Sequence, residues 1–336
     1  MRVAIVIGAT ALGLSLAGTA RAQGTGRSLD IQPGARENGL GAAGVALPGD
    51  PCDAVWWNPA ALGFAEWYSG QWTSAKLVPG LADDVRYKHF GVAVPIKGFG
   101  GAALGYTRLS YGSSEGADPQ GNPTGTFESW ESSHSVAAGY RVNGVLAFGL
   151  TVKYVRIVLA PSSLSGTAST VGFDFGGLYR QPIAGMTLGL GLNVQNIGPR
   201  VSFANEDRSD PLGRNLKVGG AVTVPVPLGS GGFEIGGAAV ADYNHSLVTS
   251  DFNTWHGGVE LYGAFAKWVR VMYRRGYYED VLGDIGDYTH GAGVRVAGAT
   301  FDVAWIPQPR NLGLDRLRKI TVGLNSDALS SLLSAH

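Results

Sequence analysis

Residues 145–158 read VLAFGLTVKYVRIV, and this stretch decides the fold. One set of alternate positions holds large apolar side chains, whereas the set between them holds small or polar ones. The first set is Leu146, Phe148, Leu150, Val152 and Tyr154, and the second is Val145, Ala147, Gly149, Thr151 and Lys153. Because successive strand residues point to opposite faces, the stretch predicts a β-strand with one apolar face and one small or polar face.

The same alternation recurs along the chain, for example in residues 185–196, which read GMTLGLGLNVQN. The alternating segments run to about 10 to 13 residues, close to the ~9 to 11 that a tilted strand needs to cross a bilayer. A soluble β-sandwich shows the same alternation with its apolar face inward, so periodicity alone leaves that alternative open.

Aromatic residues near the segment ends favour the membrane barrel, because such barrels carry aromatic girdles at both interfaces. The aromatic residues expected in the girdles are Tyr106, Tyr111, Trp130, Tyr140, Tyr154, Tyr179, Trp255, Tyr262, Trp268 and Tyr288. The opposite face of the segments carries glycine and scattered charges, which suits a barrel lumen. We therefore predict an all-β, transmembrane antiparallel β-barrel with an N-terminal plug segment.

We expect about 14 strands in this barrel, an even number that is usual for single-chain bacterial barrels. The expected strands are 67–77, 85–96, 99–110, 127–141, 145–158, 167–180, 185–196, 212–226, 232–243, 252–263, 266–276, 287–298, 300–307 and 316–325. Some connections are tight, such as 97–98 and 229–232, whereas 112–126 and 205–211 are expected to be long polar loops. Short turns at one rim and longer loops at the other are typical of outer-membrane barrels.

Composition excludes several other classes of protein. The 336 residues carry 26 basic and 26 acidic side chains, so no basic excess points to nucleic acid. Charged residues make up only 15% of the chain, and glycine is abundant at 52 residues. No segment after the N-terminus has the ~18 consecutive apolar residues of a membrane-spanning helix. The lone Cys52 cannot form an internal disulfide, and we expect it to be a small buried residue.

Four regions follow from these patterns. Residues 1–22 read as a signal peptide, with Arg2 before an apolar stretch and an A-x-A cleavage pattern at residues 20–22. Residues 23–66 form the expected plug, because their apolar content disfavours the alternative of a disordered tail. The barrel follows at 67–325. The tail, 326–336, is either a short amphipathic helix or a frayed terminus.

A family resemblance rests on the N-terminal region. Residues 33–46 read PGARENGLGAAGVA, Asp50 follows, and residues 57–62 read WNPAAL. Weaker matches are residues 191–199, GLNVQNIGP, and 256–261, HGGVEL. Together they resemble the PorV/PorQ family, relatives of the FadL-like long-chain fatty-acid transporters.

The resemblance implies a fourteen-stranded barrel whose N-terminal segment plugs the lumen, with Trp57 anchoring the plug and Asn58 and Pro59 shaping the turn into the barrel. The plug motif it implies comprises Gly34, Arg36, Gly39, Gly41, Gly44, Asp50, Trp57, Asn58 and Pro59. The chain departs from the family at Ala61, where glycine is usual, and in lacking a terminal aromatic strand residue.

Two functions follow from the resemblance. The first is a secretion-associated interaction barrel of the bacterial outer membrane, a PorV-like shuttle or scaffold for secreted cargo or secretion-complex proteins. The alternative is a FadL-like transporter of hydrophobic small molecules. A transporter needs a continuous apolar pocket beside the plug. The side chains expected to face the lumen are polar, which favours the first function; they are Lys153, Asp174, Gln195, Lys217, Glu234, Arg270, Arg274, Arg295 and Asp302.

Several motifs match enzyme or cofactor patterns without the required context, so we expect no enzyme and no cofactor. Residues 39–44, GLGAAG, match a dinucleotide fingerprint but follow no strand. Residues 112–116, GSSEG, match a serine-hydrolase pattern in an expected polar loop. The six histidines lack zinc-ligand spacing. An acidic run at 279–287 leaves calcium as an alternative to a solvated loop.

Overall fold

The structure is a computed structural model that describes residues 24–118, 120–161, 165–203, 209–228, 232–249, 252–265, 268–281, 283–309 and 313–326. The expected signal peptide lies outside the described residues, as does all but Ser326 of the expected C-terminal tail. Among these described residues, no helix is long and apolar enough to cross a membrane.

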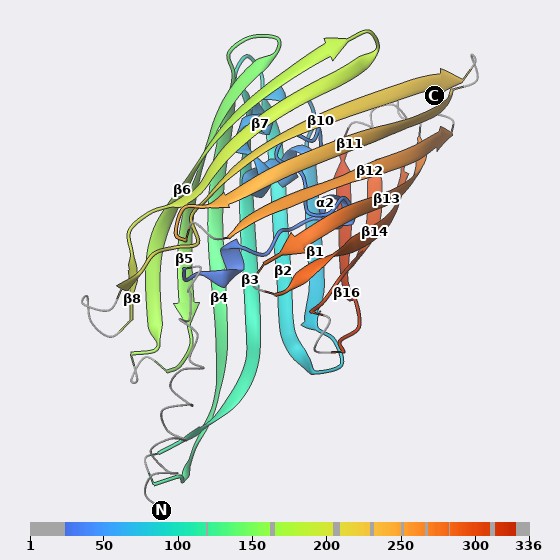
Figure 1. The fold of residues 1–336 in the computed structure, drawn as a ribbon. Helices are drawn as coiled ribbons and strands as arrows, with labels where there is room; N and C mark the ends of the chain where they lie inside the picture. The colour runs from blue at the N-terminus through green and yellow to red at the C-terminus, as the bar shows by residue number, and fades with distance from the viewer. Residues whose placement is uncertain are drawn as a thin grey trace, which may run out of the picture.

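Fourteen strands of the described chain close into one antiparallel barrel, which confirms the predicted fold class (Figure 1). The barrel strands are β1 (Ser69–Val78), β2 (Ala82–Ile96), β3 (Gly100–Ala117), β4 (Pro123–Arg141), β5 (Leu146–Val158), β6 (Thr167–Ile183), β7 (Met186–Ile197), β10 (Asn215–Leu228), β11 (Phe233–Ser246), β12 (Asn253–Phe265), β13 (Val269–Asp280), β14 (Ile285–Val296), β15 (Ala299–Ile306) and β16 (Leu317–Asn325). Two short strands between β7 and β10, β8 (Val201–Ser202) and β9 (Ser209–Asp210), form a separate sheet. Pairing of β1 with β16 leaves the barrel without an open edge, as a sheet in lipid requires.

The large apolar side chains of the strands point outward. In β5, Phe148 and Leu150 are 53% and 40% exposed, whereas Ala147, Thr151 and Lys153 are buried. A soluble sandwich would bury the large apolar face instead. The observed arrangement is that of a membrane barrel, in which lipid covers this face.

The two rims differ as predicted. At the rim where β1 begins and β16 ends, the turns are short, such as Ala184–Gly185 and Ala297–Gly298. At the opposite rim the connections include 198–214 and 307–316. Because outer-membrane barrels have short periplasmic turns and longer extracellular loops, we call these the periplasmic and the extracellular rim.

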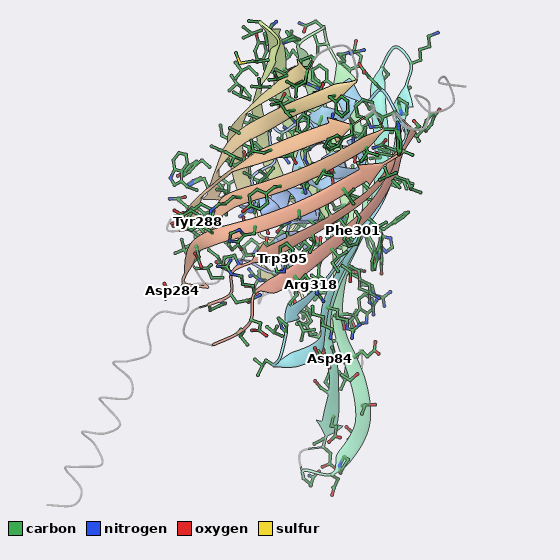
Figure 2. All side chains as sticks on the ribbon, turned by 90° about the vertical axis from the view of Figure 1, so that its right-hand side faces the viewer. Asp84, Asp284, Tyr288, Phe301, Trp305 and Arg318 are labelled. Atoms are coloured by element: carbon green, nitrogen blue, oxygen red, sulfur yellow. The ribbon has the colours of Figure 1, made fainter. Side chains whose placement is uncertain are left out.

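The prediction of a long polar loop at 112–126 is wrong. Strands β3 and β4 continue through most of this region and pair with each other from Ser113 and Glu128 to Ala117 and Pro123. Neither neighbouring strand reaches so far, because β2 ends its pairing at Tyr111 and β5 at Trp130. The resulting two-stranded arm, residues 112–129, extends well beyond the extracellular rim (Figures 1 and 2).

Two of the ten expected girdle residues point into the lumen. The hydroxyl of Tyr111 donates to Glu131, and that of Tyr262 donates to Glu234. A β-bulge between Ser110 and Gly112 shifts the register at Tyr111, so its position near a strand end does not decide which face it occupies. Tyr154, Trp255 and Tyr288 are among the others, and they are exposed on the outer wall.

The segment before β1 folds inside the barrel as short helices (Figure 1). They are η1 (Arg27–Leu29), α2 (Ala35–Gly39), η2 (Pro51–Asp53), α3 (Ala54–Trp57) and η3 (Pro59–Phe64). Glycines of the wall allow close approach of this plug: a Cβ at Gly276 would lie 2.2 Å from the backbone nitrogen of Gly41. Gly41 itself has a φ of 79°, a conformation that favours glycine.

Candidate functional site

The turn between α3 and η3, which precedes β1, is built around Asn58. The Asn58 amide donates to the main-chain oxygens of Val45 and Gly177, at 2.9 and 3.1 Å. Its side-chain oxygen accepts from the Ala60 backbone nitrogen at 3.1 Å, and Pro59 begins the helix η3. Ala61 lies inside η3 and has no positive φ, so alanine fits where the family usually has glycine.

Trp57 is buried between the plug and the wall. Its ring packs edge-on against Trp56, with centroids 4.7 Å apart, and a Cβ at Gly44 would lie 2.8 Å from it. The main-chain oxygens of Trp57 and Trp56 accept hydrogen bonds from Asn193 and Gln195 of β7, at 2.9 and 2.6 Å. The inward polar residues of the wall therefore hold the plug's backbone.

Charged residues inside the barrel are mostly paired. Lys153 and Asp174 lie 2.7 Å apart, and both are fully buried. Arg274 of β13 contacts Glu260 at 2.6 Å and Asp302 at 2.5 Å. Because an unpaired buried charge is costly, these contacts explain how a lumen packed by a plug tolerates such residues.

The structure places all nine expected lumen residues on the inner side of the wall. Arg270, Arg274, Arg295 and Asp302 line one cavity, Lys217 lines another, and Gln195 bonds to the plug. Glu234 lies 3.5 Å from Arg270 near the periplasmic rim. Of the nine expected plug-motif residues, Gly34, Arg36, Gly44, Asp50, Trp57 and Asn58 line the first cavity. Gly39 and Gly41 approach the wall closely instead, and Pro59 begins η3.

The plug separates two cavities in the lumen. The periplasmic cavity has a volume of about 260 Å³, and Gly34–Glu37 form part of its lining. The extracellular cavity has a volume of about 390 Å³, and Gln32 and Asn38 form part of its lining. Since α2 lies between them, the described residues enclose no continuous apolar channel from rim to rim.

The periplasmic cavity contains two buried carboxyl groups close together, Glu37 and Asp53. A Cβ at Gly49 would lie 3.9 Å from one Glu37 oxygen and 3.5 Å from one Asp53 oxygen. Burial raises the pKa of Glu37 to about 7, and it raises the pKa of Asp53 well above its usual range. The negative charge of Glu37 also raises the pKa of Asp53 through like-charge repulsion.

The extracellular cavity combines aromatic surface with cationic groups. Lys217 of β10 is 6% exposed, and its ammonium lies 4.1 Å from the Trp56 ring centroid and 5.2 Å from that of Trp57. In the part of the chain that the structure describes, this ammonium has no hydrogen-bond acceptor and no ion-pair partner. Arg214 and Asn244 also line the cavity, and each has a buried polar atom without a partner, Nε and Oδ1 respectively.

Sequence reasoning missed several of these residues. The alternation predicts that Lys217 faces the lumen, but it does not predict the contact with Trp56. The two adjacent tryptophans, 56 and 57, were a signal that an aromatic surface would lie in the plug. Glu37 and Asp53 stand in the plug without any spacing that marks them as a pair. For the acidic run at 279–287, the described residues contain no group of three or more His, Cys, Asp or Glu side chains that could hold a metal.

No family model and no curated protein match the chain. Among solved structures, it is similar to a Pseudomonas aeruginosa FadL homologue, with 13% identity, a TM-score of 0.44, and coverage of 88% of this chain and 98% of that one. It is also similar to the Ralstonia pickettii toluene transporter TbuX, with 13% identity, a TM-score of 0.49, and coverage of 87% and 97%. A third similar structure is the Pseudomonas putida toluene transporter TodX, with 11% identity, a TM-score of 0.41, and coverage of 87% of this chain and 96% of that one. The similar solved structures thus include FadL-type barrels, and likeness at this level assigns no substrate.

Proposed function

We propose that this protein is a barrel of the bacterial outer membrane that takes up small amphipathic molecules with an acidic group, as a FadL-like transporter would. The outward apolar wall and the unequal rims support this location. The extracellular cavity is the entry site, because it lies at the long-loop end of the lumen and has aromatic and aliphatic lining beside its cations. The proposal assigns no catalytic chemistry to the protein.

The observation that carries the proposal is the ammonium of Lys217, which lines the extracellular cavity and has no hydrogen-bond acceptor in the described part of the chain. A buried cation without an acceptor is unfavourable, and the neighbouring tryptophan rings offset only part of that cost. Asp242 is a nearby carboxylate, but no ion pair joins it to Lys217 in the described part of the chain: its Oδ2 accepts from the backbone nitrogens of Gly44 and Val45 at 2.6 and 2.9 Å, and its Oδ1 is buried without a hydrogen-bond partner. A carboxylate ligand would give Lys217 a charge-assisted hydrogen bond, while its apolar body would contact Trp56.

Passage through the barrel requires the plug to move. The plug is held by hydrogen bonds from Asn58, Asn193 and Gln195 and by the ion pair of Arg36 with Glu260. Arg36, Asn58 and Glu260 line the periplasmic cavity, and we expect a ligand from the extracellular cavity to reach the periplasm only after some of these contacts break.

Octanoate is a suitable probe for the entry site, with octanol as its uncharged counterpart. We expect octanoate to change the tryptophan fluorescence of the purified barrel in mild detergent. The Lys217→Met variant should weaken octanoate binding by about tenfold or more, as loss of one charge-assisted bond predicts. Lys97→Met, which removes a cation from an exposed periplasmic turn, is the matched control.

Two results would contradict the proposal. Equal octanoate binding by wild type and Lys217→Met would remove Lys217 from the site. If the barrel binds octanoate normally but does not increase its entry into proteoliposomes, the protein binds the ligand without transporting it.

The secretion-associated function is a second candidate, and the arm of residues 112–129 favours it. The arm pairs only with itself beyond the barrel and carries Glu115, Asp118 and Glu128 without any basic residue. At its tip, Asp118 accepts hydrogen bonds from the backbone nitrogens of Gln120 and Asn122. Mass spectrometry of proteins that co-purify from outer membranes, with and without the arm, tests this candidate. Stoichiometric partners that depend on the arm would support it.

A further inference from the structure

The outer wall of strands β2 to β5 carries a row of cations at one level of the barrel. Lys88 pairs with Arg108 across β2 and β3, Arg108 pairs with Ser132 across β3 and β4, and Ser132 pairs with Arg156 across β4 and β5. Register partners share a face of the sheet, and the alternate residues Tyr87, Leu109 and Val155 are buried inside. We call Lys88, Arg108, Ser132 and Arg156 the cationic row.

A neighbouring row of aromatic side chains places the cationic row at the membrane surface. Two residues nearer the periplasm along each strand lies an aromatic row, whose register partners are Trp72, Phe90, Tyr106, His134 and Tyr154. A girdle of aromatic rings on the outer wall of a membrane barrel marks the membrane–water interface. The cationic row lies on the extracellular side of these rings, at the depth of the outer-leaflet headgroups.

The cations of this row have few protein partners. In the described part of the chain, Lys88 and Arg156 form no ion pair, and Arg108 reaches only Glu128, at 4.0 Å. Arg108 instead lies 4.2 Å from the centroid of the Trp130 ring, and Arg156 lies 5.9 Å from it. By contrast, Lys76, at the neighbouring level on β1, is paired with Asp83 at 2.9 Å.

Outward cations also lie on β13 and β16, but neither has a cationic register partner in the described strands: Arg275 faces Val259 and His290, and Arg318 faces Trp305. On β10 and β12, outward residues toward the extracellular end, such as Val218, Trp255 and Val259, are uncharged and exposed. On the face shown in Figure 2, Phe301, Trp305 and Arg318 lie on the outer side of β15 and β16, and Asp84 lies where the arm leaves the barrel. A uniform belt of charge would serve solubility at the interface, whereas a local unpaired row favours one kind of ligand.

We propose that the cationic row binds the phosphate groups of a lipid headgroup in the outer leaflet. Arginine matches phosphate by paired hydrogen bonds. Strands lie about 4.8 Å apart, so Lys88 and Arg156 are separated by about 14 Å, which suits a headgroup with two phosphates. The aromatic row below contacts the sugar and the upper acyl chains. This inference rests on the proposed outer-membrane location and is independent of transport.

Native mass spectrometry of the full-length barrel in mild detergent, with diphosphorylated lipid A as probe, tests the inference. We expect wild type to retain the lipid, and Arg108→Gln/Arg156→Gln to bind it at least tenfold more weakly. The control Lys97→Gln/Arg141→Gln also removes two exposed cations near β2 to β4, but at the periplasmic rim, and should bind like wild type. Lys88→Gln alone should give an intermediate loss if the double variant does not fold.

Three outcomes would overturn the inference. The first is equal retention of lipid A by wild type and the Arg108/Arg156 variant. The second is equal binding of fully dephosphorylated lipid A by wild type. The third is displacement of the lipid by millimolar inorganic phosphate, which would make the row a site for free phosphate. The same variants should bind octanoate like wild type, so a failure of the lipid test is distinguishable from a failure of the proposed uptake. Membrane fractionation tests the outer-membrane location separately.

Discussion

Arg36 of the plug and Glu260 of β12 form a two-point ion pair inside the barrel, with Nε to Oε2 at 3.0 Å and Nη2 to Oε1 at 2.9 Å. The same carboxylate accepts from Nε of Arg274 at 2.6 Å, and Arg274 reaches Asp302. The plug is thus tied to three strands of the wall through one charge network. Its release during uptake requires a rearrangement of this network.

Arg36→Met should loosen the plug without unfolding the barrel. It leaves Glu260 with Arg274 alone, and removal of one partner of a buried pair costs roughly 3 kcal/mol. Hydrogen exchange of residues 24–66 should speed up strongly, while exchange in β1 to β5 should change little. Lys97→Met is the control. Unchanged exchange in the plug would show that the ion pair does not hold it.

The contact between Asn58 and the wall can be tested through Gly176. A Cβ at Gly176 would lie 2.1 Å from Asn58 Oδ1, so Gly176→Ala should displace the turn into β1. We expect a loss of roughly 2 to 3 kcal/mol in unfolding free energy, as for overpacking of a buried site. In an Asn58→Ala background the same change should cost less, because only the 3.0 Å contacts with Ala60 and Pro59 remain. Urea unfolding of wild type, both single variants and the double variant measures this coupling. Additive effects would contradict the contact.

The protonation of Glu37 predicts a pH dependence of plug stability. Burial raises the pKa of Glu37 from 4.5 to about 7, so the folded state binds the proton more tightly than the unfolded state. The stability that this proton contributes is fully present below pH 4.5 and is lost as the pH rises to about 7, a change of roughly 3 kcal/mol. Hydrogen exchange of the plug between pH 4.5 and 7.5, after correction for intrinsic rates, measures it. Glu37→Gln should flatten the dependence, and an unchanged slope in that variant would assign it to another group.

The arm of residues 112–129 should be dispensable for folding. Its strands pair only with each other, so replacing residues 114–127 by an Asn-Gly turn should leave the barrel closed. Heat-dependent mobility in gel electrophoresis should match that of wild type. Loss of folding would show that the arm helps β3 and β4 to pair during assembly.

The sequence by itself determined the barrel wall. Alternation with period two in segments such as 145–158 is a local property of strands, and the order of short and long connections follows from where those segments end. The resemblance added the expectation of a plug and of a turn at Asn58 and Pro59. All the predicted strands are present, and the largest error in length, at 112–126, arose because glycine, serine and proline obscured the alternation there.

Only the tertiary structure decided what the inward residues do. Asn58 bonds to Gly177, 119 residues away, and Arg36 bonds to Glu260, 224 residues away. Tyr111 and Tyr262 turned inward, although their place near strand ends had favoured the outside. Lys217 lies beside Trp56 and has no hydrogen-bond acceptor among the described residues. Periodicity separates two faces of a strand, but a lumen is filled by contacts between distant segments, and those depend on the register in which the barrel closes.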